Sequence, residues 1–202
     1  MAPRKAAALR DGDRSLREHL IDTAERMIAD HGTSGLTVRA IAREAGVADG
    51  VLYNHFTDKE ELLANALLAH IDTVEGGLEP LPKPGTASVE ANLTAYLAHG
   101  LALHEAILPA FVGLANQPAV LARFSDLTGG HQWRDHLTSY LDSEQTLGRI
   151  TPDAEPEVAA ALLVGICHET VLSMMLSHTP RATATPSVES VISTVLKGII
   201  DY

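Results

Sequence analysis

Apolar positions near both ends of the chain recur with the spacing of amphipathic helices. Residues 16–28 carry apolar side chains three and four positions apart, and Ser15 with Glu18 has the spacing of a capping box. Gly32 is expected to end this first helix. The most regular pattern covers residues 188–199, where apolar residues stand at i, i+3, i+4, i+7, i+8 and i+11. The pattern therefore predicts a helix near each end of the chain.

Two short helices and one longer helix are predicted between residues 37 and 75. Thr37 is a good N-cap for a helix that stops at Gly46, and a second helix over residues 48–55 follows almost at once. Thr57 with Glu60 predicts the start of a helix over residues 58–75. Two short helices joined by a tight turn that contains glycine form a helix-turn-helix, although an ordinary helical hairpin without a partner has the same spacing.

Glycine and proline divide the remainder of the chain. Residues 76–87 hold several of each and predict a linker. Beyond the linker we expect a helix from Val89 that Pro109 kinks or ends, and a helix over residues 156–178. Between them we expect one long helix over residues 118–148, with a weak point at Gly129-Gly130. The expected fold is all-α: a disordered basic tail (1–14), a three-helix helix-turn-helix domain (15–58) and a larger helical domain (59–202).

Composition agrees with this fold class. Hydrophobic residues make up 46% of the 202 residues and aromatic residues only 4%, so a core of Leu, Ala, Val and Ile is expected. Cys167 is the one cysteine, which excludes an intrachain disulfide and a zinc motif built on cysteines. The longest apolar run, residues 158–167, is about half the roughly 20 residues of a membrane span. We expect a cytoplasmic protein with no membrane segment.

The net charge of −11 weighs against nucleic-acid binding, because neutralising phosphates requires Lys and Arg. Residues 1–60, however, hold nine basic and ten acidic residues, whereas residues 61–202 hold six and sixteen. The acidic excess thus lies almost wholly beyond residue 60. A near-neutral N-terminal part can still bind DNA if its basic side chains share one face.

The amino-acid sequence of residues 36–63 resembles the N-terminal signature of TetR-family transcriptional regulators. The strongest matches are the run from Leu52 to Phe56 (Leu-Tyr-Asn-His-Phe) and the Lys59-Glu60 pair that follows it. The resemblance implies a regulator, most often a ligand-responsive repressor, that binds a palindromic double-stranded DNA operator as a dimer. The chain departs from the family's pattern at Val51, where many members carry Thr.

The resemblance also implies roles for individual residues. Phosphate contacts are implied for Thr37, Tyr53, His55 and Lys59, with Arg39 as a further backbone contact, and base-edge positions for Ala48, Asp49, Gly50 and Asn54. Asp49 brings a negative charge to the reading turn, which weakens binding unless the charge is paired. The alternative is that Tyr53 and Phe56 are core aromatics and that His55 and Lys59 are simple surface residues.

For the body, the resemblance implies a homodimer through a four-helix bundle of the last two helices. A small-molecule effector is expected among the middle helices, with no cofactor and no metal site. The candidate pocket residues combine adaptable apolar groups with a few polar ones, and each of them could instead be core: Tyr96, His99, His104, Phe111, Trp133, His136, Cys167, His168, Met174 and Met175.

A helical-bundle enzyme and an adaptor that does not bind DNA are the alternatives. His168-Glu169 begins like a zinc-protease pair, but Leu172 occupies the position of the second histidine. His99 and His104 are five residues apart, which does not place them on one helical face. The chain has no Gly-rich phosphate loop and no nucleophile elbow. We therefore expect no enzymatic activity.

Overall fold

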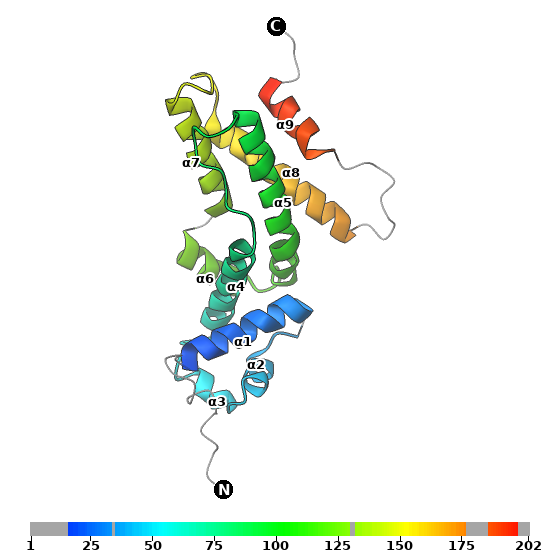
Figure 1. Cartoon of the computed structure of the whole chain (residues 1–202). Coiled ribbons are helices and arrows are strands. Elements are labelled where there is room, and N and C mark those ends of the chain that lie inside the picture. The colour runs from blue at the N-terminus through cyan, green and yellow to red at the C-terminus, as the bar shows by residue number, and fades with distance from the viewer. Residues whose placement is uncertain (1–15, 34, 130–131, 177–185, 198–202) are drawn as a thin grey trace. The chain divides into compact units, whose positions relative to one another are not determined.

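The computed structural model describes residues 16–33, 35–129, 132–176 and 186–197 (Figure 1). The predicted basic tail, Ser15 and Ile199 lie outside these ranges. The described residues form α-helices and no β-strand, which confirms the all-α fold class. The helices are α1 (Leu16–His31), α2 (Val38–Glu44), α3 (Asp49–Leu52), α4 (Lys59–Gly76), α5 (Val89–Gly113), α6 (Pro118–Thr128), α7 (Gln132–Thr146), α8 (Pro156–Leu176) and α9 (Val188–Lys197).

The chain divides into two compact units, and α5 contributes to both of them. The first unit comprises residues 1–76 and 109–130, and the second comprises residues 77–108 and 131–202. The first unit therefore contains α4, α6 and the end of α5 in addition to the segment that the sequence assigns to a helix-turn-helix domain.

The first unit is built around α1 and α4. α1 packs against α2 and α4, and α4 packs in turn against α6. Leu20 and Ala24 of α1 and Leu63 and Leu67 of α4 are fully or almost fully buried, as expected for one apolar stripe on each helix. α1 ends where the sequence predicts, because Gly32 adopts a φ of +66° that favours glycine.

The second unit contains most of α5 together with α7, α8 and α9. α7 packs against α8, and the apolar core includes Leu93, Leu137, Leu163 and Ile192. The fully buried carboxylate of Glu144 accepts a hydrogen bond from the Gly85 backbone N–H at 3.2 Å, and Arg149 approaches it at 3.2 Å. The segment between α4 and α5, predicted as a linker, is therefore tied to α7 by a buried charge.

Three predicted boundaries differ from the structure. The second short helix covers only four residues, Asp49–Leu52, and residues 53–55 continue as turns. The long helix predicted over residues 118–148 is two helices, and α6 ends at Gly129, whose φ of +69° is left-handed. α5 continues through Pro109 as far as Gly113, so the predicted helix end at this proline is wrong and the predicted kink stays a prediction. Local propensity signals do not include the packing that shortens or extends a helix.

Candidate nucleic-acid interface

The helix-turn-helix of the first unit is formed by α2, a tight turn and α3. Thr37 is the predicted N-cap, because its backbone is extended and its hydroxyl oxygen accepts a hydrogen bond from the Ala40 N–H at 3.2 Å. Gly46 takes a φ of +72°, and the Val47 N–H donates to the Ala42 carbonyl at 2.9 Å. Ala42 is fully buried, so the small side chain lets the helices approach closely.

The two aromatic residues that follow α3 have opposite environments. Phe56 is 4% exposed and belongs to the core, and the guanidinium of Arg17 lies 4.8 Å from the centroid of its ring. Tyr53 is 62% exposed. The core alternative therefore holds for Phe56 and fails for Tyr53, whose ring and hydroxyl are available to a partner.

The predicted DNA-contacting residues lie on the surface of this unit. Leu52 and Phe56 anchor the segment from inside, and the polar side chains between and around them remain accessible. His55 is half-buried. The exposed members of the set are Thr37, Arg39, Ala48, Asp49, Gly50, Tyr53, Asn54 and Lys59.

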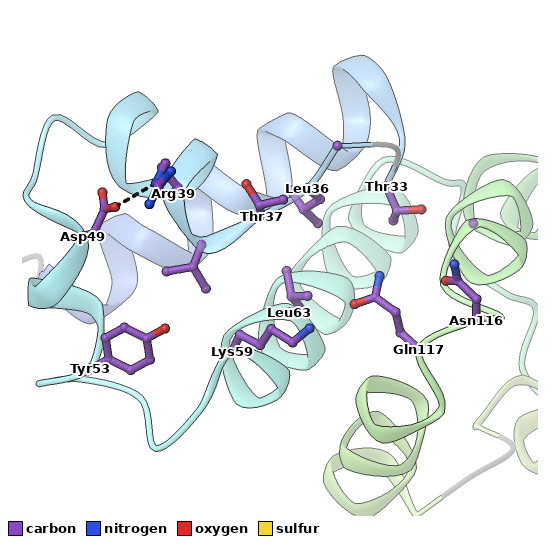
Figure 2. Close-up of a pocket in the computed structure, with 13 residues that line it drawn as sticks. Thr33, Leu36, Thr37, Arg39, Asp49, Tyr53, Lys59, Leu63, Asn116 and Gln117 are labelled. Atoms are coloured by element: carbon purple, nitrogen blue, oxygen red, sulfur yellow. Dashed lines mark hydrogen bonds and ion pairs between the residues drawn. The ribbon is translucent and has the colours of Figure 1, made fainter.

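A cleft of about 1030 Å³ brings several of these residues together (Figure 2). Its walls include Thr37 and Arg39 from α2 and its cap, Tyr53 after α3, and Lys59 at the start of α4. Asn116 and Gln117, from the turn between α5 and α6, line the same cleft. The sequence does not predict that these two amides line the cleft, because nothing in its pattern indicates that residues 116–117 lie close to residue 59.

The charge of Asp49 is paired within the protein. Its Oδ2 lies 3.2 Å from Nε of Arg39, and Figure 2 shows this contact across the turn from α2 to α3. Lys59 lies 3.6 Å from the carboxylate of its neighbour Glu60. The negative charge of Asp49, which weighs against DNA binding, is therefore balanced by the positive charge of Arg39.

The start of α4, which positions Lys59, is held by two carboxylates. Oδ1 of Asp58 accepts a hydrogen bond from the Glu61 N–H at 2.7 Å, and Arg123 of α6 donates to the other oxygen of Asp58 at 3.1 Å. Glu61 accepts from the Thr57 N–H at 2.8 Å and from Arg17 at 3.0 Å. The N-cap of α4 is thus Asp58, and the predicted pairing of Thr57 with Glu60 is wrong by one residue.

These hydrogen bonds favour the ionised carboxylates. The Glu61 backbone N–H, followed by Arg123, holds the pKa of Asp58 below its usual value. The Thr57 backbone N–H is the largest cause that lowers the pKa of Glu61, with a further contribution from Arg17. Lys59 therefore follows a residue that stays negatively charged at neutral pH and that fixes the first turn of α4.

The candidate effector residues fall into separate groups. In the second unit His99 stacks on Trp133 with ring centroids 5.0 Å apart, and Tyr96 lies 6.1 Å from the same tryptophan. His104 meets His168 edge-on at 4.8 Å. The neighbour of His168, Cys167, is buried. Within each of these two groups, the predicted residues lie close together or are neighbours in the sequence.

The other four candidates lie elsewhere. Phe111 belongs to the first unit, where it packs edge-on against Phe124 at 5.2 Å. His136 is exposed, and Met174 and Met175 are 51% and 40% exposed. A groove of about 390 Å³ in the second unit is lined by residues of α5, α8 and α9 that the prediction did not include.

The described residues contain no group of three or more His, Cys, Asp and Glu side chains that could hold a metal ion. Two described helices, Val89–Gly113 and Pro156–Leu176, are long and apolar enough to pass a composition test for membrane spans. Core helices of soluble proteins pass the same test, so length and composition do not assign either helix to a membrane.

Comparisons with known proteins agree with the local geometry. Residues 20–66 match the model of the bacterial regulatory proteins of the tetR family. The repressor KstR2 of Mycolicibacterium smegmatis is 36% identical over 76 residues, which are 38% of this chain and 37% of the relative. The match thus spans less than half the length of this curated relative. The repressor AcnR of Corynebacterium diphtheriae is 27% identical over 190 residues, 91% of this chain and 90% of its own.

The fold of the chain is also found in solved structures. The transcriptional regulator FadR of Bacillus subtilis, solved in complex with stearoyl-CoA, superposes with a TM-score of 0.58 at 20% identity. The superposition covers 91% of this chain and 99% of that one. Residues 20–66 are thus similar to the N-terminal segment of the TetR family of bacterial regulatory proteins, and the chain shares its fold with a solved transcriptional regulator.

Proposed function

We propose that the chain is a transcriptional repressor that binds a palindromic DNA operator as a homodimer and is released by a small-molecule effector. The observation that carries the DNA-binding part is the anchored helix-turn-helix, in which Leu52 and Phe56 are buried while Tyr53, Asn54 and Lys59 are exposed. Such an arrangement presents polar side chains to a major groove about 12 Å wide. The named relatives KstR2 and AcnR are repressors.

The contacts divide by chemistry. The ammonium of Lys59 and the hydroxyls of Tyr53 and Thr37 bind phosphates, which fixes the register but carries no sequence information. Asn54 is proposed to read a base edge, because an asparagine amide can pair bidentately with adenine. Within this scheme Asn116 and Gln117 are further donors to the backbone, since they line the same cleft as Lys59.

Salt-dependent duplex binding tests this proposal. Fluorescence anisotropy with the full chain and labelled duplexes, taken from the DNA upstream of its own coding region, should give a logarithmic affinity that falls linearly with the logarithm of the salt concentration. A scrambled duplex of the same length should bind at least about 1000-fold more weakly at physiological salt. Equal binding to both duplexes would overturn sequence-specific recognition, and no binding to either would favour an adaptor that does not bind DNA.

The homodimer is proposed to form through α8 and α9. Along α8 the apolar side chains of Leu162 and Met174 are 57% and 51% exposed, and on α9 Leu196 is 43% exposed. Exposed apolar residues gathered on two helices are typical of an interface. A dimer accounts for these faces of α8 and α9 and agrees with a cytoplasmic location. Two half-sites about 34 Å apart are the usual target of such a dimer.

The effector is proposed to bind in the second unit, among α5, α7 and α8. The FadR structure contains stearoyl-CoA, so acyl-CoA thioesters are the first ligands to test. An effector that weakens operator binding must itself bind less tightly to the DNA complex, by the same factor. Thermal-shift measurements with stearoyl-CoA, followed by operator titration in its presence, test both statements. Stabilisation by the ligand with unchanged operator affinity would contradict the regulatory role.

A further inference from the structure

The ion pair between α2 and α3 joins one guanidinium group to a carboxylate across the turn. Arg39 is the second residue of α2, and Asp49 is the first residue of α3. Their side chains are 88% and 53% exposed, yet Nε and Oδ2 lie 3.2 Å apart. Exposed pairs of this kind contribute little to folding stability, so the effect of the contact is on orientation.

The contact uses the nitrogen of Arg39 that is not needed for reading a base. Its Nε donates to Asp49, which leaves Nη1 and Nη2 as a fork of parallel donors. That fork matches O6 and N7 of guanine, the commonest specific contact in a major groove. A free arginine would lose side-chain entropy on taking this position, whereas Arg39 is already held on one side.

The location of the pair agrees with a reading role. Both residues line the cleft that contains Tyr53 and Lys59, and Asp49 begins the helix that carries the base-edge positions (Figure 2). Because the pair is neutral as a whole, Asp49 can stand close to the DNA without a net repulsion from the phosphates.

We infer that Arg39 and Asp49 act as one base-reading unit, in which Asp49 orients Arg39 toward a guanine of the operator. The inference rests on the proposed DNA-binding function and deepens it. It replaces the backbone contact implied for Arg39 by a base contact. Asp49 becomes a positioning residue for Arg39 in place of an independent reader of cytosine.

The first experiment is selection of duplexes from a random-sequence pool by the full chain and three variants. The wild type should select a guanine at one position of each half-site. Arg39→Ala and Arg39→Lys should both lose that preference by at least about fivefold, because a lysine keeps the charge but lacks the fork. Arg43→Ala is the matched control, since Arg43 is an exposed arginine of the same helix. It should weaken binding without changing the preferred bases.

The second experiment is a double-mutant cycle on the guanine preference. Asp49→Ala should reduce the preference for guanine over adenine while binding to random DNA improves. The variant that carries both Arg39→Ala and Asp49→Ala should discriminate no worse than Arg39→Ala alone, since the two residues act through the same contact. Independent readers would instead give losses that multiply. All the substituted side chains are exposed, and circular dichroism checks that each variant folds.

The outcomes distinguish a failure of the DNA-binding proposal from a failure of the Arg39–Asp49 reading unit. If the wild type selects no sequence, the DNA-binding proposal fails and the reading unit fails with it. If the wild type selects an operator and Arg39→Ala selects the same one, DNA binding stands and the reading unit is wrong. Multiplicative losses in the cycle would also overturn it, because they assign separate bases to Arg39 and Asp49.

Discussion

Arg123 of α6 donates a hydrogen bond to Asp58 at 3.1 Å, and the same carboxylate caps α4 through the Glu61 N–H at 2.7 Å. One side chain thus joins α6 to the first turn of the helix that begins with Lys59. The cap is local in sequence, whereas the ion pair spans 65 positions. Substitutions at Asp58 can separate the two contributions.

Replacing Asp58 by alanine removes both the cap and the ion pair, whereas asparagine retains an oxygen that can cap the helix. We expect Asp58→Ala to lower the Tm more than Asp58→Asn does, and Arg123→Ala to resemble Asp58→Asn. Thermal unfolding followed by circular dichroism measures all three. Equal losses for alanine and asparagine at position 58 would show that the ion pair, and not the cap, carries the effect.

The lowered pKa values of Asp58 and Glu61 make stability depend on pH in one direction. Each carboxylate stabilises the folded state while it is ionised, so its contribution is present above the unfolded-state pKa of about 4 and is lost as the pH falls through the lower folded-state pKa. Acid unfolding of Asp58→Asn should therefore begin from a lower stability at neutral pH and fall less steeply below pH 4. An unchanged acid profile would contradict this reasoning.

Gly113 has no room for a side chain. A Cβ at this position would lie 2.1 Å from Oγ1 of Thr33, whose hydroxyl donates to the Ala110 carbonyl at 3.4 Å. Gly113→Ala must displace that hydroxyl, and we expect a loss of about 1 to 3 kcal/mol in the free energy of unfolding. The variant that combines Thr33→Ala with Gly113→Ala should recover part of the loss in urea denaturation. No recovery would place the strain elsewhere.

Lys59 and Asn54 should differ in what their loss does to DNA binding. Lys59→Ala should weaken binding to all sequences alike and reduce the slope of log affinity against log salt by about 1. Asn54→Ala should reduce the discrimination between bases at one position of each half-site by about 1 to 3 kcal/mol. Titrations of the selected operator and of its single-base variants at several salt concentrations measure both. Reversed behaviour would exchange the two roles.

The proposed dimer predicts different effects for two exposed leucines. Leu162 of α8 is 57% exposed and Leu127 of α6 is 48% exposed. A charge at Leu162 would be buried in the interface, so Leu162→Glu should convert the dimer to a monomer in size-exclusion chromatography with light scattering. Leu127→Glu is the matched control and should leave the dimer intact. A wild type that is itself monomeric at micromolar concentration would refute the interface.

Cys167 should be inert in the folded protein. The thiol is buried, and burial raises its pKa to about 12, so almost no thiolate forms near pH 8. We expect no reaction with a thiol reagent such as dithionitrobenzoate under native conditions and full reaction of one thiol in guanidinium chloride. Rapid native labelling would mean that the interior around α8 opens readily.

Local signals in the sequence predict the elements whose ends depend on single residues. Thr37 caps α2, Gly32 ends α1, and Pro118 and Pro156 each open a helix, because a cap, a left-handed glycine or a proline acts within one turn. The residues proposed to contact DNA are predicted from a contiguous motif, and all of them except the half-buried His55 are exposed.

Contacts between distant residues are what the sequence did not predict. The pairing of Arg39 with Asp49 depends on the angle at which α2 and α3 meet, and Arg123 reaches Asp58 only because α6 packs on α4. Neither the angle nor the packing is encoded in a local pattern. The same reason explains why the ten candidate effector residues separate into groups, since apolar periodicity does not say which helices are neighbours.

The four residues of α3 have a consequence for how operator recognition could be lost. A helix of one turn does not form by itself, because the free-energy cost of nucleation exceeds the stabilisation from its few hydrogen bonds. Its existence depends on Leu52 and Phe56 in the core beneath it. Truncation of either anchor should therefore abolish the proposed operator recognition, although every side chain proposed to contact DNA is still present. In genetic screens, loss-of-repression alleles should then fall at buried, apolar positions as often as at the exposed, polar ones.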